Sequence, residues 1–342
     1  MRKPVCSFSF DPLPGSIPYE SRRSIRVKAK FAGLTFIDFL CRYHPPIARQ
    51  TWLDWIDAGD IRIDSFPVRA TRVVREGDCF VHVMHDVTEP EVNGNVSVIH
   101  QDKSMLVIDK PAPLPMHASG RFSRNTLLYL LQQHYSQERL RIAHRLDANT
   151  TGVVVVCRSG EAAAFVQPQF ERREVEKLYL VRATGSIAWN HYRCDLAISS
   201  SPAVGGRRRG AGGRTAIDAS ADAGSLPGQV LGLPARTDFE VVKRLPDNTT
   251  LLLARPLTGR TNQIRVHLWS LGFPVFGDPL YLTENKLGEQ QTLTPDAQPL
   301  CLHAHRLTFC DPTSKTRKTF ESEPPPWWID GVRSHLSLGT SI

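Results

Sequence analysis

The sequence predicts an α+β fold whose central sheet is mixed and mostly antiparallel. Strand-patterned segments outnumber helical ones, and most strands follow one another along the chain with few helices between them. In addition, Val153–Val156 is a run of four β-branched residues, which is typical of a strand buried on both faces. We therefore expect a large sheet with a small number of covering helices.

The length of the chain, 342 residues, allows two domains or one domain with an appendage. Two short helical patterns followed by short strand patterns indicate a small α+β module near the N-terminus. A stretch rich in turn formers and without periodicity then separates this module from the main domain. We predict an irregular arm, a module, a linker and a main domain over residues 1–24, 25–88, 89–97 and 98–335, respectively.

The composition is that of an ordinary globular protein, with 41% hydrophobic and 22% charged residues. The formal net charge of +8 favours a polyanionic partner, although a basic surface without such a partner is also consistent with it. The seven cysteines are scattered and form no C-x-x-C motif, which argues against a disulfide framework or zinc site and for a reducing cytoplasm. No apolar run approaches the roughly 18 residues of a membrane span, and no secretory leader pattern is present.

Residues 199–236 are rich in Gly, Ala, Ser and Pro and cannot bury much apolar surface. We predict a flexible insertion here. Its arginines, Arg207–Arg209 and Arg214, could contact RNA phosphates without regard to sequence. A solvated insertion with no role fits the same composition.

The strongest candidate for a reactive group is Asp147, which lies in a polar turn directly before the valine strand. A carboxylate at the mouth of a buried strand has a fixed backbone and can serve as a nucleophile or as an electrostatic partner. An aspartate that only accepts backbone hydrogen bonds within a turn fits this stretch equally well.

Two further segments place polar side chains among apolar ones. Strand alternation over 176–183 puts Lys177 and Tyr179 on one face, where a core tyrosine is the alternative to a functional one. A helix beginning near Thr261 would bury Ile264, Leu268 and Leu271, with Arg265 on the neighbouring face.

Two segments leave the role of their polar residues open. Lys110 and His117 flank a proline-rich extended stretch, and they could contact phosphate or sugar or be structural. His303 and His305 share one face of a strand, but no further ligand residue has suitable spacing, so we expect no metal site.

These segments together resemble the RluA-type pseudouridine synthases. Residues 144–152 resemble the signature H-R-L-D-x-x-T-S-G, with Thr151 in place of the usual Ser. The stretches K-x-Y at 177–179, T-G-R-x-H-Q-I-R-x-H-L at 258–268 and G-D-x-x-Y at 277–281 are similar to further motifs of that family. Two positions depart from the family's patterns. Asn262 stands where the motif at 258–268 usually has His, and Pro113 stands where the stretch K-P-x-G-x-x-x-H, here residues 110–117, usually has Gly. The small module is similar to an S-four-like RNA-binding domain that precedes the catalytic domain in some members.

The resemblance implies a pseudouridine synthase fold and the isomerisation of uridine to pseudouridine in RNA, without cofactor or metal. It assigns Asp147 as nucleophile or charge-stabilising group, Tyr179 as the aromatic residue that stacks on uracil, and Arg265 as the partner that orients Asp147. Arg145 would fill the gap left by the flipped base. Further RNA-binding positions are His144, Lys177, Arg260 and Gln263.

The resemblance further implies an enzyme that works as a monomer in the cytoplasm, with ribosomal RNA expected ahead of tRNA. Whether the intermediate is a covalent ester or a glycal stays open. A non-catalytic RNA-binding protein on the same scaffold is the main alternative. A glycoside or nucleoside hydrolase is a further one, but such enzymes normally use a second carboxylate, and none is near Asp147 in the sequence.

Overall fold

The computed structural model of the chain describes residues 5–199 and 232–328 and divides them into two compact units. The larger unit consists of the segment up to Pro14 together with the chain from Pro90 onward, and the smaller unit is Gly15–Glu89. Within these described residues, every helix is too short or too polar to cross a membrane.

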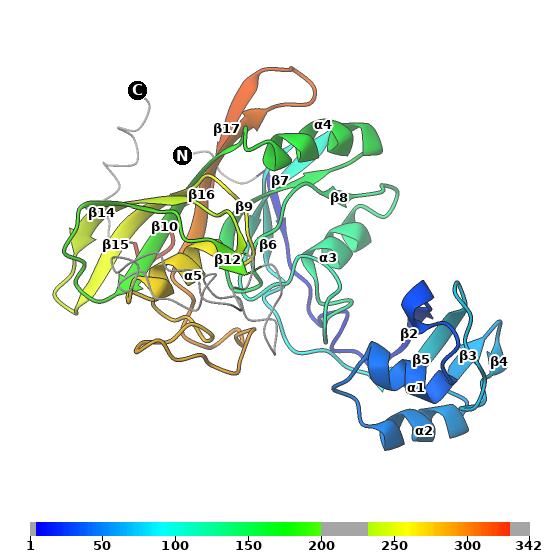
Figure 1. Cartoon of the computed structure of the whole chain (residues 1–342). Coiled ribbons are helices and arrows are strands. Elements are labelled where there is room, and N and C mark those ends of the chain that lie inside the picture. Colours follow the sequence, from blue (N-terminus) through cyan, green and yellow to red (C-terminus); the bar gives the residue numbers. More distant parts are fainter. Residues whose placement is uncertain (1–4, 200–231, 329–342) are drawn as a thin grey trace. The chain divides into compact units, whose positions relative to one another are not determined.

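The larger unit is built on an 11-stranded mixed sheet (Figure 1). Its strands lie in the order β1 (Cys6–Phe8), β6 (Val96–Gln101), β7 (Met105–Lys110), β9 (Thr151–Cys157), β16 (Leu302–Cys310), β10 (Glu176–Thr184), β15 (Thr249–Pro256), β14 (Thr237–Arg244) and β11 (His191–Cys194). Two more strands, β8 (Arg141–Ile142) and β17 (Arg317–Glu321), pair with β9 and β16. The predicted mixed, mostly antiparallel sheet is confirmed, because β9 and β16 form the one parallel pair among these strands.

Three helices cover the two faces of this sheet: α3 (Leu127–His134), α4 (Gly160–Glu171) and α5 (Gln263–Ser270). The valine strand is buried on both sides, as predicted. Val153 and Val155 pack in the cluster that includes α4 residues, and Val154 and Val156 pack in the cluster that includes residues of α3 and α5. Four adjacent β-branched residues therefore serve two cores at once.

Gly152 allows the turn that carries Asp147 to pack closely against β16, the strand that runs parallel to β9. It has a φ of +109°, and a Cβ atom there would lie 2.2 Å from the carbonyl oxygen of Ala304 in β16. Only glycine permits this conformation together with this close backbone approach.

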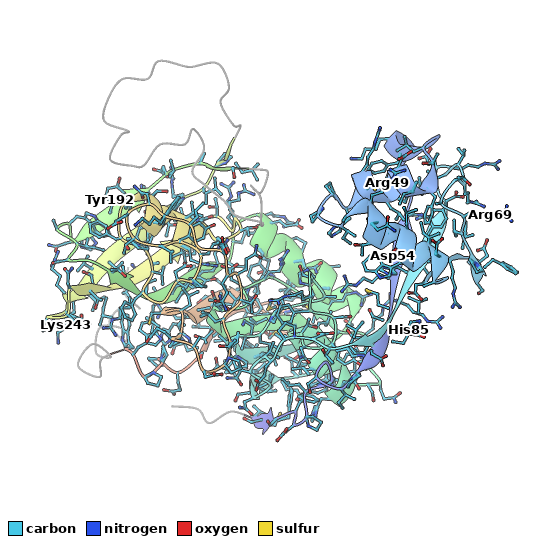
Figure 2. The ribbon with its side chains drawn as sticks, turned by 90° about the horizontal axis from the view of Figure 1, so that it is seen from below. Arg49, Asp54, Arg69, His85, Tyr192 and Lys243 are labelled. Carbon is cyan, nitrogen blue, oxygen red and sulfur yellow. The ribbon has the colours of Figure 1, made fainter. Side chains whose placement is uncertain are left out.

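The smaller unit packs two helices, α1 (Phe36–Tyr43) and α2 (Arg49–Asp57), on a four-stranded sheet in the order β2 (Tyr19–Arg26), β5 (Cys79–Val87), β3 (Ile61–Ile63) and β4 (Phe66–Pro67). A short 3₁₀ turn, Ala29–Phe31, precedes α1. Thr35 caps α1 by accepting the Asp38 N–H, as its sequence position indicated. Arg49 and Asp54 on α2 and His85 on β5 are outward-facing in Figure 2.

The structure corrects the boundaries predicted for the N-terminal third. The segment 1–24 is not an irregular arm, because β1 pairs with β6 in the main sheet and β2 begins at Tyr19. Strand β6 also begins at Val96, within the predicted linker. Three residues of β1 are too few for periodicity, and β2 buries only Ser21 and Ile25, so neither strand carries a strong apolar pattern.

The predicted insertion 199–236 is too wide at its ends. Short strands β12 (Ile198–Ser199) and β13 (Gly232–Leu233) pair with each other, and Ala235 is buried. The central part, including Arg207–Arg209 and Arg214, lies outside the described residues.

Candidate active site

All eight predicted site residues line one cavity of about 680 Å³ in the larger unit. They come from the turn before β9, the start of β10 and the N-terminal end of α5, with its preceding loop. A volume of this size accommodates a nucleotide. The residues are Asp147, Tyr179, Arg265, Arg145, His144, Lys177, Arg260 and Gln263.

The backbone of the Asp147 turn is fixed from several sides. The Thr150 N–H donates to the Asp147 carbonyl at 3.1 Å, and the neighbouring Ala148 carbonyl accepts from the Leu114 N–H at 2.8 Å. Lys110 Nζ also donates to this Ala148 carbonyl at 3.0 Å, and to the carbonyls of Pro111 and Leu114 at 2.9 Å each. Lys110 is fully buried, so its role is to hold the turn rather than to contact phosphate or sugar.

Arg265 links the Asp147 carboxylate to a second, deeply buried carboxylate. One of its terminal nitrogens donates to Asp147 Oδ2 at 3.1 Å. Its Nε and other terminal nitrogen donate to the two oxygens of Asp278 at 2.7 and 2.8 Å, a bidentate pair that fixes the guanidinium plane. Burial alone would lower the pKa of Arg265, but Asp278 and then Asp147 raise it above its ordinary value. Arg265 is therefore a permanent, immobile cation beside Asp147.

The far side of this ion network is held by Asn262 and the segment 278–281. Asp278 Oδ1 also accepts the N–H groups of Leu280 and Tyr281, at 2.9 and 3.0 Å. Asn262 precedes α5 with a left-handed φ of 56°, accepts from Arg265 at 3.2 Å and donates to the Tyr281 hydroxyl at 3.1 Å. Asparagine tolerates this backbone conformation better than most residues.

Asp278, Asn262, Tyr281 and Lys110 were not predicted as site residues. The G-D-x-x-Y motif at 277–281 was the available signal for Asp278 and Tyr281, since a motif adjoining α5 points to a shared structure. Nothing in the spacing showed that Asp278 would share Arg265 with Asp147.

Tyr179 lies on β10, buried to 9% exposure, at a point where the register between β10 and β16 shifts. It lines the cavity together with Asp147. Burial, and then the negative charge of Asp147, raise the pKa of Tyr179 above its ordinary value. Its hydroxyl therefore keeps its proton at neutral pH, while the ring offers an aromatic surface to a base.

Two predicted RNA-binding residues are committed to contacts within the protein. His144 Nε2 accepts the Val155 N–H at 3.2 Å, and its ring stacks on Phe170 with centroids 4.4 Å apart. Burial, and then the charge of Lys177, lower the pKa of His144 to about 3, so the ring is neutral and does not attract phosphate.

Gln263 makes four hydrogen bonds through its amide. Its oxygen accepts from Thr258 Oγ1 and the Arg260 N–H at 2.6 and 3.0 Å, and its nitrogen donates to the Arg236 carbonyl and Thr237 Oγ1 at 2.9 and 3.0 Å. These bonds use the full capacity of an amide. Gln263 therefore holds the loop before α5, and its contact with RNA stays a prediction.

The other three residues present positive charge to the cavity. Arg145 is exposed. Lys177 is half-buried and donates to the Thr258 carbonyl at 2.9 Å. Arg260 is half-buried and donates to the Pro234 carbonyl at 3.1 Å through Nε.

The two histidines of β16 have partners of their own. His303 Nδ1 contacts Thr151 Oγ1 at 2.8 Å, and His305 Nδ1 contacts the Ser322 carbonyl at 2.7 Å. Within the described ranges, no group of three or more His, Cys, Asp or Glu side chains is placed to hold a metal ion.

Comparison with known proteins identifies the family. The family described as RNA pseudouridylate synthase matches residues 104–270. A protein of Aquifex aeolicus, named an uncharacterized RNA pseudouridine synthase, is 30% identical over 302 residues, which cover 84% of this chain and 89% of that protein. The chain belongs to the RNA pseudouridine synthases. It is an isomerase, as the resemblance of its motifs predicted.

Two further proteins are similar to this chain. A yeast (Saccharomyces cerevisiae) protein named tRNA pseudouridine(31) synthase is 28% identical over 287 residues, covering 77% of this chain and 70% of the yeast protein. The solved structure of human RNA pseudouridylate synthase domain containing 1 is similar with a TM-score of 0.51 and 24% identity. It covers 72% of this chain and 96% of the human one, and confirms the pseudouridine synthase fold.

Proposed function

We propose that Asp147 is the catalytic carboxylate that acts at C1′ of the target uridine, with Arg265 orienting it and Tyr179 beneath the base. The observation that carries this is the Arg265 bridge between Asp147 and Asp278. Asp147 is the more exposed end of that bridge, with 28% of its side chain exposed against 1% for Asp278. Only Asp147 of the two carboxylates also lines the cavity.

The reaction breaks the N1–C1′ glycosidic bond and joins C5 to C1′ after the base has turned. The proton on C5 is lost to water, and N1 ends with a proton, so no oxidant or reductant is needed. A carboxylate stabilises a carbon with cationic character either through charge or by forming an ester. The fixed guanidinium of Arg265 holds one oxygen of Asp147, which leaves the other to face the sugar.

We propose that the target uridine is flipped out of its stack to reach this cavity, because a base inside a helix cannot meet Asp147. We propose that Arg145, which is exposed and two residues before Asp147, fills the gap that the base leaves. Lys177 and Arg260 would contact the RNA backbone. These contacts position RNA and carry little sequence information.

We propose ribosomal RNA as the substrate. The smaller unit supports this, because α1 and α2 are followed by β3, β4 and β5, as in the sequence pattern that resembles an S-four-like module, with β2 added before the helices. The name of the yeast relative makes tRNA the competing outcome. Mapping pseudouridines in ribosomal RNA and tRNA from cells with and without the protein decides between them.

We further propose that the enzyme acts as a monomer in the cytoplasm. All seven cysteines are free thiols, which agrees with a reducing compartment. Sedimentation of the purified protein and its localisation in cells test these two points.

The central test is Asp147→Asn, assayed by tritium release from [5-³H]uridine RNA prepared from cells that lack the protein. The amide is nearly isosteric but cannot act as nucleophile or carry the charge, so we expect a loss of at least about a thousandfold in rate. RNA affinity should stay within a few-fold. Asp238→Asn is the matched control, because Asp238 is ion-paired to Arg193 outside the cavity.

Persistent tritium release by Asp147→Asn would show that another group does the chemistry. A wild-type protein that binds RNA but releases no tritium from any RNA would instead favour a non-catalytic RNA-binding protein.

A further inference from the structure

A second cavity of about 670 Å³ adjoins the active-site cavity. The two cavities share four lining residues: Arg173, Lys177, Pro256 and Thr258. They are therefore neighbouring compartments separated by one wall. An RNA strand that places a flipped uridine in the first compartment has its adjacent nucleotides within reach of the second.

Most cations of the second cavity are neutralised by carboxylates of the protein. Arg255 pairs with Glu240 at 2.8 Å, Arg306 with Glu321 at 3.6 Å, and Arg236 with Asp195. These guanidinium groups help to form the cavity, but their charges are largely balanced.

The shared wall is different. Arg173 and Lys177 have no carboxylate within ion-pair distance in the part of the chain that the structure describes. Lys177 gives one proton to the Thr258 carbonyl, and it has three to donate. Burial, and then the charge of Arg173, lower the pKa of Lys177 to about 8. An anion placed between these two cations would relieve that repulsion.

Arg173 also occupies an unusual backbone position. It follows the end of α4 with a left-handed φ of 65°, where a glycine would fit without strain. The chain instead places an exposed guanidinium at the wall between the two cavities.

Much of the remaining lining of the second cavity is apolar, and the two carboxylates that also line it, Glu176 and Asp195, are paired with Arg317 and Arg236. Val175, Leu178 and Ala235 are buried in its wall, and Leu257 is 40% exposed there. A surface with apolar area on one side and two unpaired cations on the other suits a nucleotide, which combines a flat base with an anionic linkage.

We propose that the second cavity binds the ribonucleotide adjacent to the target uridine, with the linking phosphate between Arg173 and Lys177. This rests on the proposed function, because it takes the first cavity to hold the target uridine. The enzyme would then recognise two consecutive nucleotides of an unstacked RNA segment rather than a single flipped base.

The first test is a double-mutant cycle, in which one RNA phosphate and the Arg173 side chain are altered separately and together. Short RNA substrates that contain the mapped target uridine are made with a neutral methylphosphonate linkage on its 5′ or its 3′ side. For the wild-type enzyme, we expect one of the two linkages to raise the half-saturating RNA concentration roughly tenfold. Arg173→Gln should raise it similarly with the natural linkage and show no further change with that methylphosphonate.

Arg172→Gln is the matched control, since Arg172 is the exposed neighbour of Arg173 and lines neither cavity. It should leave both effects as in the wild-type enzyme. Additive effects of Arg173→Gln and the methylphosphonate at both linkages would overturn the proposal, as would equal effects of Arg172→Gln and Arg173→Gln.

The second test addresses the base. Leu257→Glu puts a negative charge at the mouth of the second cavity, whereas Leu282→Glu changes a similarly exposed leucine, 37% exposed, outside both cavities. We expect only Leu257→Glu to weaken RNA binding, roughly fivefold. An abasic site next to the target uridine should weaken wild-type binding similarly and make Leu257→Glu less harmful. Equal effects of the two glutamates would count against the second cavity as a nucleotide site.

These tests separate the inference from the assignment of Asp147. The inference predicts changes in half-saturating RNA concentration while Asp147 is intact, whereas the catalytic assignment predicts a lost rate with binding preserved. If Asp147→Asn stays active while the cycle shows coupling, the second site stands and the catalytic residue is wrong.

Discussion

The active-site cavity has two walls that use charge in opposite ways. On the wall formed by α5 and the loop before it, Arg265 donates to Asp147, Asn262 and Asp278, and its side chain is 4% exposed. The second wall comprises Arg145 and Arg173, which are exposed and have no carboxylate partner among the residues described. The cation of the first wall already has its ion pairs and hydrogen bonds within the protein. The cations of the second wall have no carboxylate partner and are available to RNA phosphates.

The difference supports our proposal that the first wall carries the chemistry and the second binds RNA. Groups that must meet a reacting carbon need fixed geometry, which buried bidentate pairs supply. Groups that meet a phosphate backbone gain most when they are solvated and unpaired beforehand, since little is broken when RNA binds. Variants on the first wall should therefore change the rate at saturation, and variants on the second should change the RNA concentration required.

Among the residues that support Asp147, the largest effect is expected for Arg265→Met. Its loss frees the orientation of Asp147, so we expect the single-turnover rate at saturating enzyme to fall by roughly a hundredfold to a thousandfold. Arg265→Lys keeps the charge without the planar fork and should be partly active. If Arg265 only bound phosphate, both variants would raise the half-saturating concentration and leave the saturated rate intact.

Arg265→Met should also lower the free energy of unfolding. Asp278 has a side chain only 1% exposed, and without Arg265 it is a buried unpaired charge, which costs roughly 3–5 kcal/mol. The double variant Arg265→Met, Asp278→Asn should recover most of this unfolding free energy while staying inactive. Urea unfolding of the single and double variants, run beside the rate assay, separates lost folding from lost catalysis.

Asn262→Gly should give an intermediate effect on the same wall. Glycine adopts the left-handed backbone without strain, so the change removes only the side chain that holds Arg265 and the Tyr281 hydroxyl. We expect a roughly tenfold lower saturated rate with RNA affinity unchanged, measured under single-turnover conditions. A change confined to RNA affinity would show that Asn262 acts in RNA binding rather than in positioning Arg265.

Arg145→Gln tests the binding wall. We expect roughly tenfold weaker binding of RNA in which the target uridine is paired, because the side chain no longer fills the gap left by the base. The loss should be smaller for RNA in which that uridine is already unpaired. Equal losses for both substrates would make Arg145 a simple phosphate contact.

The smallest effect concerns pH and Lys177. Its folded pKa of about 8 is below the ordinary 10.5, so raising the pH through 8 removes a charge from the free enzyme. RNA affinity should fall about threefold more between pH of about 7.5 and about 8.5 than it does for Lys177→Gln. For stability the sign is opposite: the unfolded chain binds the extra proton between 8 and 10.5, so Lys177 makes the unfolding free energy rise with pH there. If RNA affinity changes equally with pH in the wild-type enzyme and in Lys177→Gln, the charge of Lys177 does not contribute to the pH dependence of RNA binding.

Sequence predicted the fixed wall only in part. Asp147 and Arg265 were predicted from long motifs and Tyr179 from the short K-x-Y stretch, and all three line one cavity. Asp278 was missed because its importance depends on a contact with Arg265 that no spacing rule contains. Gln263 was predicted to contact RNA because it lies in the motif at 258–268, and the sequence does not show that its amide makes four hydrogen bonds within the protein.

The fold was predicted where burial imposes a pattern and missed where it does not. Val153–Val156 had to be a strand, since both faces of β9 are covered. Strand β1 joins the sheet through backbone hydrogen bonds of three residues, which leave no trace in side-chain periodicity. The order of strands also depends on which distant segments pair, and local patterns do not encode that choice.

Gly152 packs closely against Ala304 of β16, so the active site can be completed only after β16 has been synthesised. The turn that carries Asp147 adjoins a strand that is paired in parallel with β16, and β16 lies near the end of the described chain. A nascent chain that has not yet emerged as far as β16 contains every motif discussed above, yet one side of the catalytic strand has no neighbour. Long-range pairings of this kind form slowly. Until β16 has paired with β9, the turn that carries Asp147 lacks the neighbour against which Gly152 packs.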